Sequence, residues 1–411
     1  MRLEPDLSSA SEPRPNQAHQ SLQTDNPEYL QTQLVTYIGN KRALLDFIGR
    51  GVAHVQQALG KQKLSCFDGF SGSGIVSRFL KRHASFLAAN DLELYAKIIS
   101  RCYLANKSDL NLTLLTEYYD KLIAEVSSEM HRYSACDEKP GFISRLYAPA
   151  DENRIQADDR CFYTRYNANY LDLCRQKIDA IIPPDFRDFF IAPLLSEASI
   201  HANTAGIFKG FYKNRDTGLG QFGGTARNAL TRILGKIALP FPVFSDFDCR
   251  TRIFNDDTNS LVKSDDLYSP DFLGASCEFD LAYFDPPYNQ HPYGSNYFML
   301  NLIASYIPPD SRSISRVSGI PAGWNRSLYN KKRLVLPVFM ELIKNVRAKF
   351  VLISFNSEGF IPKDEMIRSL SDCGTVHVLE SDYNTFRGSR NLSGRSIHVK
   401  EYLFLLDKRK R

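Results

Sequence analysis

An acid, two prolines and an aromatic residue follow a strongly apolar run in the stretch DLAYFDPPYNQ, residues 280–290. Two consecutive prolines cannot continue a strand, because neither has an N–H to donate to a neighbouring strand. A rigid turn would hold the Asp285 carboxylate and the Pro286 carbonyl at the strand tip, where both can accept hydrogen bonds from one amino group. The ring of Tyr288 offers a face on which a planar base can stack. The stretch therefore predicts a site for an aromatic amine, and the alternative is an ordinary turn in a loop.

A second group of chemistry-bearing residues is the glycine-rich stretch DGFSGSG, residues 68–74. Glycines between a strand and a helix let a ligand approach the backbone closely, and Asp68 can fix the turn or accept a hydrogen bond from a ligand amine. The spacing matches neither the G-x-G-x-x-G of dinucleotide-binding folds nor the phosphate-binding P-loop. Taken alone, the stretch fits a ligand-binding loop and a plain tight turn equally well.

Asp91, in the stretch AAND, ends the next apolar run, about 20 residues beyond the glycine turn, which is the usual spacing for an acid that binds ribose hydroxyls. Glu93 competes for that role, and the structural alternative is a helix N-cap at Asp91. Together with the glycine stretch, Asp91 favours a cofactor that carries a nucleoside.

These residues lie in an alternation of predicted strands and helices. Residues 63–81 and 84–106 each read as a strand followed by a helix, and the alternation resumes after residue 250. This order is typical of an α/β, doubly wound sheet. The intervening segment is mainly helical and polar and then glycine-rich, which indicates an inserted second lobe. Further elements are predicted at residues 44–59, 227–237, 251–254, 280–284, 297–306, 333–346, 349–355, 375–381 and 401–406.

The composition is that of an ordinary soluble protein, with 43% hydrophobic and 24% charged residues in 411. We expect a cytoplasmic protein, because there is no apparent signal peptide and no apolar run long enough to span a membrane. The eight cysteines show no C-x-x-C spacing, which argues against a zinc site and a disulfide framework.

Positive charge is concentrated in three segments. Residues 205–236 carry six Lys or Arg against one Asp, residues 311–333 carry six against none, and residues 384–411 carry eight against two acids. The net charge of the whole chain is only +5, so the remainder is acidic. Positive segments on an acidic body favour a polyanionic partner, and the alternative is three solvated loops.

The sequence resembles the DNA adenine N6-methyltransferases that use S-adenosylmethionine. DPPY after an apolar strand is similar to their catalytic signature. YIGNKRALLDFI (residues 37–48), DGFSGSG and NDLELYA (residues 90–96) resemble their N-terminal cofactor motif, glycine motif and ribose motif. The order of these motifs resembles the alpha group, which includes Dam-type and FokI-type modification methyltransferases. The resemblance covers residues 34–106 and 200–406.

The resemblance implies a class I methyltransferase fold, a mixed seven-stranded sheet with an inserted, mainly helical target-recognition lobe. We expect a disordered tail at residues 1–30, a catalytic domain at residues 31–106 and 250–411, and the DNA target-recognition region at residues 107–249. The implied reaction is site-specific methyl transfer to N6 of a flipped-out adenine in double-stranded DNA, without a metal. A restriction-modification system with a cognate endonuclease is the implied context.

The resemblance also implies roles for individual residues. The catalytic candidates are Asp285, Pro286 and Tyr288. The cofactor-binding candidates are Tyr37, Lys41, Asp68, Gly72, Gly74, Asp91, Asp257 and Asp285, with Lys41 as a partner for the cofactor carboxylate. The DNA-binding candidates are Lys209, Lys213, Arg215, Arg227, Arg312, Arg316, Arg387, Arg390 and Arg395. Arg232 is a further candidate for a phosphate contact, and Arg326 for a contact with the duplex.

Other activities remain open at this point. A cytosine N4 or RNA amino-methyltransferase is the nearest alternative, although cytosine enzymes more often have Ser at the motif acid and many RNA guanine enzymes have Asn. A catalytically silent nucleic-acid-binding homologue is a second alternative, which the intact DPPY disfavours. A dinucleotide oxidoreductase is a third, and the glycine spacing disfavours it.

Overall fold

Seven strands form one sheet in the order β3-β2-β1-β4-β5-β7-β6, in which β7 runs antiparallel to both of its neighbours and the other pairs are parallel. The predicted doubly wound, mixed sheet is confirmed. The computed structural model describes residues 25–134, 138–224, 229–287, 289–384 and 398–409. The strands are β1 (Leu64–Asp68), β2 (Ala84–Asn90), β3 (Arg250–Phe254), β4 (Phe279–Phe284), β5 (Ala348–Asn356), β6 (Thr375–Asn384) and β7 (His398–Asp407).

The central strand β4 shows how the apolar run specifies a buried strand. All six of its residues are buried. Phe279, Ala282 and Phe284 face one hydrophobic core, whereas Leu281 and Tyr283 face another. A continuous apolar sequence is therefore required, because helices cover both faces of a doubly wound sheet.

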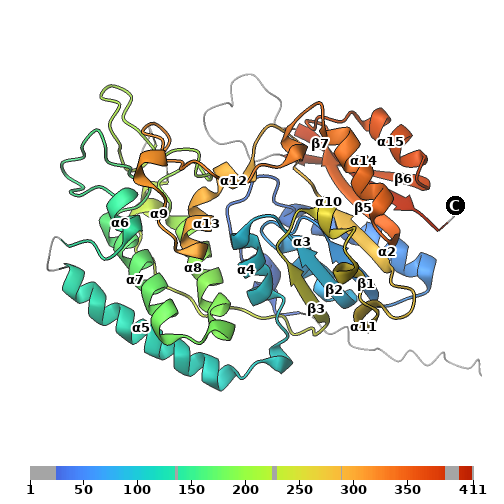
Figure 1. Ribbon diagram of the computed structural model, residues 1–411, viewed down its shortest axis with the longest axis horizontal. Helices are drawn as coiled ribbons and strands as arrows, with labels where there is room; N and C mark the ends of the chain where they lie inside the picture. Colours follow the sequence, from blue (N-terminus) through green and yellow to red (C-terminus); the bar gives the residue numbers. More distant parts are fainter. Residues whose placement is uncertain (1–24, 135–137, 225–228, 288, 385–397, 410–411) are drawn as a thin grey trace, which may run out of the picture.

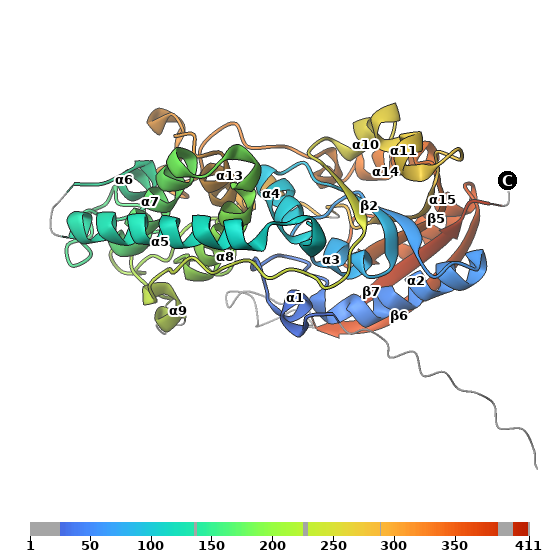
Figure 2. The same ribbon diagram turned by 90° about the horizontal axis from the view of Figure 1, so that it is seen from below.

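Helices pack on both faces of this sheet (Figure 1, Figure 2). α2 (Leu45–Leu59) and α3 (Ile75–Lys81) cover the face to which Leu281 points. α10 (Thr258–Leu261), α14 (Val335–Asn345) and α15 (Lys363–Ser371) cover the opposite face. Their apolar residues give each face a separate core.

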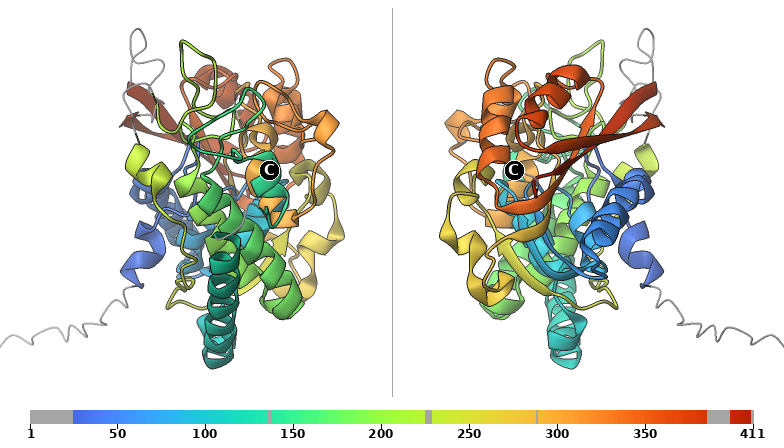
Figure 3. Two further views of the ribbon diagram at one scale, coloured as in Figure 1. Left: turned by 90° about the vertical axis from the view of Figure 1, so that its left-hand side faces the viewer. Right: turned by 90° about the vertical axis from the view of Figure 1, so that its right-hand side faces the viewer.

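A helical bundle lies beside the sheet along the long axis of the molecule and stands in front of part of the sheet in the end-on view (Figure 1, Figure 3). Its long helices are α5 (Leu112–Ser134), α7 (Arg165–Ile181) and α8 (Asp188–His201), and they share one core with α4 (Leu94–Tyr103) and α13 (Phe298–Ser305). The division at residues 107–249 stays a prediction, and this core extends beyond it on both sides. The shorter α-helices are α1 (Pro27–Gln31), α6 (Phe142–Leu146), α9 (Leu230–Leu234), α11 (Pro270–Leu273) and α12 (Tyr293–Asn296).

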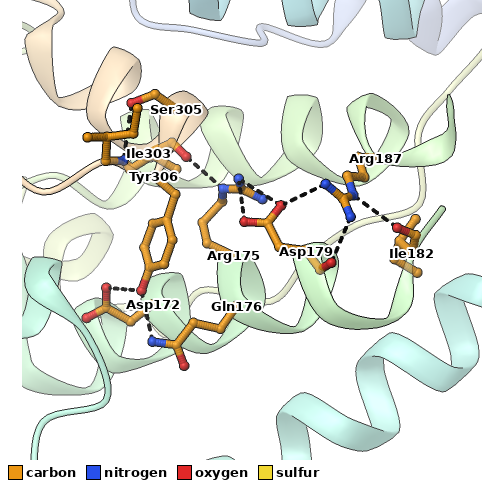
Figure 4. A network of polar contacts seen from close by, with 10 residues as sticks. Asp172, Arg175, Gln176, Asp179, Ile182, Arg187, Ile303, Ser305 and Tyr306 are labelled. Atoms are coloured by element: carbon orange, nitrogen blue, oxygen red, sulfur yellow. Dashed lines mark hydrogen bonds and ion pairs between the residues drawn. The ribbon is translucent and has the colours of Figure 1, made fainter. Parts of the chain in front are cut away.

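A polar network joins α7 to α13 inside the bundle (Figure 4). The buried Arg175 donates from Nε to the Ile303 carbonyl at 2.7 Å and pairs with Asp179 on its own helix. One turn away, the buried Asp172 accepts from the Tyr306 hydroxyl at 2.8 Å. These contacts tie α13, which follows β4 in the chain, to α7.

The structure differs from the predicted tail of residues 1–30 at its C-terminal end. α1 begins at Pro27, and Tyr29 is fully buried with its hydroxyl donating to the Tyr103 carbonyl at 2.5 Å. A buried tyrosine fixes this segment against α4, which a composition rich in Pro, Ser and Gln did not indicate. Among the described helices, none combines the length and the apolar character needed to cross a bilayer.

Asp172→Ala is expected to lower the free energy of unfolding by about 3–5 kcal/mol. The Asp172 carboxylate also accepts from the backbone N–H groups of Ile143 and Ser144 at 3.1 and 2.8 Å, so the change leaves three buried donors without their acceptor. Urea unfolding measures the loss. The control Glu125→Ala removes an exposed ion pair with Lys177 and should change stability little, and equal effects of the two changes would contradict this account.

Candidate active site

A cavity opens where the carboxyl ends of β1, β2, β3 and β4 meet, with an empty space of about 860 Å³ including its mouth. β1 and β4 are neighbours, and successive strands lie on opposite sides of this pair, which is where doubly wound sheets bind ligands. The residues that line the cavity include Tyr37, Lys41, Phe70, Ser71, Gly72, Ser73, Asp91, Glu93, Asp257, Tyr283, Asp285, Pro287, Tyr293, Asn325 and Tyr329.

The loop after β1 forms one wall of the cavity. Gly72 has φ +51°, and its N–H donates to Oδ2 of Asp91 at 2.8 Å. A Cβ on Gly72 would lie 2.9 Å from the Tyr37 ring, so both the backbone conformation and the space require glycine here. Gly74, with φ +75°, precedes α3 and is absent from the cavity lining.

Tyr37 closes the wall above this loop. Its ring stacks with Tyr293 and Tyr297 at centroid distances of 5.0 and 4.7 Å, and its hydroxyl lies 3.1 Å from that of Tyr95. Burial raises the pKa of Tyr37 well above its usual value, which keeps the phenol neutral. The stack joins the N-terminal segment to α4, α12 and the turn before α13.

Asp68 lies beneath the loop and is absent from the cavity lining. Its carboxylate accepts from the Ser77 hydroxyl at 2.5 Å and from the Phe70 N–H at 3.3 Å. Burial raises the pKa of Asp68 to about 7, with the nearby Asp285 and Asp91 adding to the shift. The geometry therefore gives Asp68 the role of holding the loop on α3, one of the two roles that the sequence allowed.

Asp91 and Glu93 both reach the cavity from the end of β2. Asp91 accepts from the N–H groups of Gly72 and Glu93, at 2.8 and 2.9 Å. Glu93 accepts from the side-chain amides of Asn301 and Asn325. Burial raises the pKa of Asp91 to about 6 and that of Glu93 to about 7, and the charge of Asp91 contributes to the second shift. The geometry is equally compatible with Asp91 and with Glu93 as the ligand of ribose hydroxyls.

Asp285 enters the cavity directly after β4. Its Oδ2 lies 3.2 Å from the Lys41 ammonium, whereas its buried Oδ1 has no hydrogen-bond partner among the described residues. Lys41 is itself buried and lies 3.1 Å from Oε1 of Glu401 on β7. Burial raises the pKa of Asp285 to about 6, against the opposing effect of Lys41. An unpartnered acceptor in a cavity is suited to a ligand amine.

Two other candidates from the sequence have distinct surroundings. Asp257 is exposed at the cavity rim and caps α10 by accepting from the Ser260 N–H at 3.0 Å. Pro286 is buried, and Pro287 lines the cavity instead. Tyr288 lies outside the described residues.

Some of the basic candidates gather on two neighbouring turns. Lys213 donates from Nζ to the Val317 carbonyl at 3.0 Å, which joins the turn that carries Arg215 to the turn that carries Arg316. Arg215 and Arg316 are exposed. Lys209 and Arg312 are also exposed, and Arg312 pairs with Asp310. Arg227, Arg387, Arg390 and Arg395 lie outside the described residues.

The structure corrects the prediction that Arg232 binds phosphate. Its guanidinium donates to the carbonyls of Ile200, Ala202 and Thr204 and thus holds the end of α8. Arg326 is exposed, with its guanidinium 4.3 Å from the centre of the Trp324 ring.

The sequence reasoning missed several residues in and behind the cavity. Glu401 lies behind the cavity lining, in a strand that was predicted, and only its acid in the apolar run EYLFLL could have signalled a buried partner. Tyr293, Asn325 and Tyr329 line the cavity and follow β4 in a segment without periodic pattern, so no local signal marked them. Within the described ranges, no group of three or more His, Cys, Asp or Glu side chains could hold a metal ion.

Known proteins resemble this chain over most of its length. Residues 37–223 match the family of D12 class N6 adenine-specific DNA methyltransferases. The type II methyltransferase M.NlaIII of Neisseria lactamica is 26% identical over 381 residues, which cover 91% of this chain and 99% of that protein. M.CviAII of Paramecium bursaria Chlorella virus 1 is 26% identical over 380 residues, covering 90% and 98%. M.FokI of Planomicrobium okeanokoites is 26% identical over 390 residues, covering 90% of this chain and 52% of that protein.

Asp68→Asn is expected to flatten the dependence of stability on pH. The folded pKa of about 7 lies above the usual value, so the folded state binds this proton more tightly than the unfolded state does. The corresponding stability is present below about pH 4 and is lost as the pH rises to about 7, by on the order of 4 kcal/mol. Urea unfolding at about pH 4.5 and about pH 7.5 measures it.

The control for this comparison is Asp271→Asn, at an exposed position of α11, which should keep the pH dependence of the unmodified protein. Parallel profiles for Asp68→Asn and the unmodified protein would show that Asp68 does not titrate with folding.

Proposed function

Because this chain belongs to the D12 class of N6 adenine-specific DNA methyltransferases, we propose that its cavity holds S-adenosylmethionine next to the target adenine, with Asp285 as the acceptor for the adenine amine. The family predicted from the motifs is confirmed, and with it an enzyme that methylates adenine N6 in DNA. The cofactor and the role of each residue are the proposed parts.

The observation that carries this proposal is the state of the two Asp285 oxygens. Lys41 occupies Oδ2 at 3.2 Å, and Oδ1 is buried at the cavity without a partner in the described part of the chain. A buried acceptor without a donor is costly to a folded protein, on the order of 1–3 kcal/mol or more for a charged group. An amine that enters the cavity would remove this cost.

The chemistry follows from the position of the amine. Inside a duplex the adenine amine cannot reach a cavity of this depth, so the nucleotide must rotate out of the helix at a cost of a few kcal/mol. Oδ1 of Asp285 and the Pro286 carbonyl would accept the two amine hydrogens, which draws electron density onto the nitrogen and favours its attack geometry. Bound S-adenosylmethionine supplies a methyl group activated by its sulfonium. Positioning by the stiff Pro286–Pro287 turn would contribute much of the rate.

The residues around the cavity fit a nucleoside-bearing cation. Asp91 and Glu93 offer carboxylate oxygens for ribose hydroxyls, and the N–H of Gly72 holds the Asp91 carboxylate in place at the cavity. Together with Asp285, these two carboxylates give the cavity an excess of acidic groups. Burial opposes their ionisation and raises their pKa values. A cationic ligand would favour their ionised form and bind more tightly as the pH rises through about 6 to 7.

Lys41 requires a revision of the role that the resemblance implied. We expected it to pair with the cofactor carboxylate, but its ammonium contacts Asp285 and Glu401 in the cavity wall. Its contribution in this proposal is therefore to hold the acceptor rather than to select the cofactor.

DNA would lie across the two joined turns. Arg215 and Arg316 project from turns that Lys213 connects, and both turns pack next to the helical bundle of the predicted target-recognition region. The similar proteins M.NlaIII and M.CviAII are named type II methyltransferases, and we extend to this chain the role of a modification enzyme in a restriction-modification system.

Asp285→Ala is expected to retain cofactor binding and to lose methyl transfer by a factor of at least about 10³, because the amine loses its charged acceptor. Transfer from labelled S-adenosylmethionine to genomic DNA, followed by nucleoside analysis, measures the activity. Calorimetry with S-adenosylhomocysteine measures the binding. Retained transfer to N6-methyladenine would overturn the role of Asp285.

Arg316→Gln is expected to weaken binding to all DNA duplexes alike and to lower the slope of log K against log salt by about one unit, because one phosphate contact is lost. Fluorescence anisotropy over a salt series measures both quantities. The control Arg368→Gln, at an exposed position of α15 on the far side of the sheet from the bundle, should leave them unchanged. A loss confined to one DNA sequence would indicate base reading instead.

A further inference from the structure

The acceptor Asp285 belongs to a buried row of charges that ends on the last strand of the sheet. The Lys41 ammonium lies 3.2 Å from Oδ2 of Asp285 and 3.1 Å from Oε1 of Glu401. Lys41 and Glu401 are 3% and 2% exposed, so solvent screens their contact little, whereas Asp285 is 18% exposed at the cavity. Nothing in the sequence motifs of the site includes Glu401.

Glu401 is itself held in place. It lies within β7, where its backbone pairs with Asn356 on β5 and with Ser381 on β6. Its Oε1 also accepts from the Ser354 hydroxyl at 2.9 Å, and Ser354 is buried on β5. A carboxylate on a strand that is paired on both sides, with a fixed hydrogen bond, is a rigid anchor for an ammonium.

The position of this anchor decides which Asp285 oxygen remains available. A lysine ammonium carries three donors on a flexible stem, and with a single carboxylate as partner it can move between the two oxygens. Glu401 draws Lys41 toward β7, and Lys41 meets only Oδ2. Building on the role proposed above for Asp285, we propose that Glu401 is a positioning residue for methyl transfer, which holds Lys41 on Oδ2 and so keeps Oδ1 free for the adenine amine.

The charges around Asp285 predict the direction in which its pKa changes when Glu401 or Lys41 is replaced. Lys41 lowers the pKa of Asp285, and Glu401 raises it. The other titratable neighbours are Tyr283 on β4 and Asp68 at the end of β1, and both of their pKa values are raised by burial first and by the charge of Asp285 in addition. Loss of the Glu401 charge should therefore let Asp285 ionise at a lower pH, and loss of the Lys41 charge should have the opposite effect.

The test compares Glu401→Gln and Lys41→Met in the full chain. Glu401→Gln is expected to reduce kcat about 10-fold with little change in the KM for S-adenosylmethionine, and to move the acidic limb of the kcat profile down by about one pH unit. Lys41→Met is expected to move that limb up. If Glu401 had a purely structural role, Glu401→Gln would not move the acidic limb of the kcat profile. A residue that only stabilises the fold changes the amount of folded enzyme and not the pKa of Asp285.

Asp280→Asn is the matched control. Asp280 is another buried carboxylate held by two lysines, Lys61 and Lys349, each at 2.8 Å, but it lies at the amino end of β4, away from the cavity. This change should lower stability and leave kcat per folded molecule and its pH profile unchanged. Stoichiometric binding of S-adenosylhomocysteine gives the amount of folded enzyme in every variant.

A milder variant covers the case in which Glu401→Gln does not fold. Ser354→Ala keeps both charges and removes the hydroxyl that orients Glu401, and we expect kcat to fall about 3-fold with a shift of the acidic limb in the same direction. If the folded variants of Glu401 and Ser354 kept the kcat and the acidic limb of the unmodified protein, the inference would be overturned. Methyl transfer retained by Asp285→Ala would instead overturn the proposed role of Asp285, so the two failures can be told apart.

Discussion

A single buried ammonium connects the parts of this active site. Lys41 comes from the turn before α2, Asp285 from the end of β4 and Glu401 from β7, and no other described contact brings these three segments together by charge. One cation between the buried Glu401 and the half-buried Asp285 leaves the group with a net negative charge. Its burial is tolerable because each charge has a partner, whereas the removal of one partner leaves an uncompensated charge in the interior. The placement of the acceptor and the electrostatics of the cavity both depend on this arrangement.

Local patterns predicted the elements that carry the chemistry. The apolar run of β4 and the two prolines behind it define a buried strand and its end, and the glycines and Asp91 define the two turns beside it. These signals are readable because each depends on residues adjacent in the chain. The pairing of Glu401 with Lys41 joins opposite ends of the sequence, and no local pattern encodes such a contact. For the same reason Arg232, which looks like its basic neighbours in sequence, binds three carbonyls inside the fold.

The helical bundle and the sheet are coupled more closely than an inserted domain suggests. α4 follows the turn that carries Asp91, α13 follows β4, and both helices contribute to the core of the bundle. Glu93, just before α4, accepts a hydrogen bond from the side-chain amide of Asn301 on α13. The two helices therefore pack in the bundle while the segments that precede them line the cavity.

The place of β7 in the sheet has a consequence for biosynthesis. β7 is the last strand made, yet it lies between β5 and β6 and carries the anchor of the charged row. A nascent chain folds its N-terminal parts first. While β7 is still inside the ribosome, the growing chain already has the glycine turn and Asp91 but lacks Glu401. The row of charges behind the cavity is therefore completed only after β7 has emerged, and products truncated before β7 keep Lys41 and Asp285 without their shared anchor.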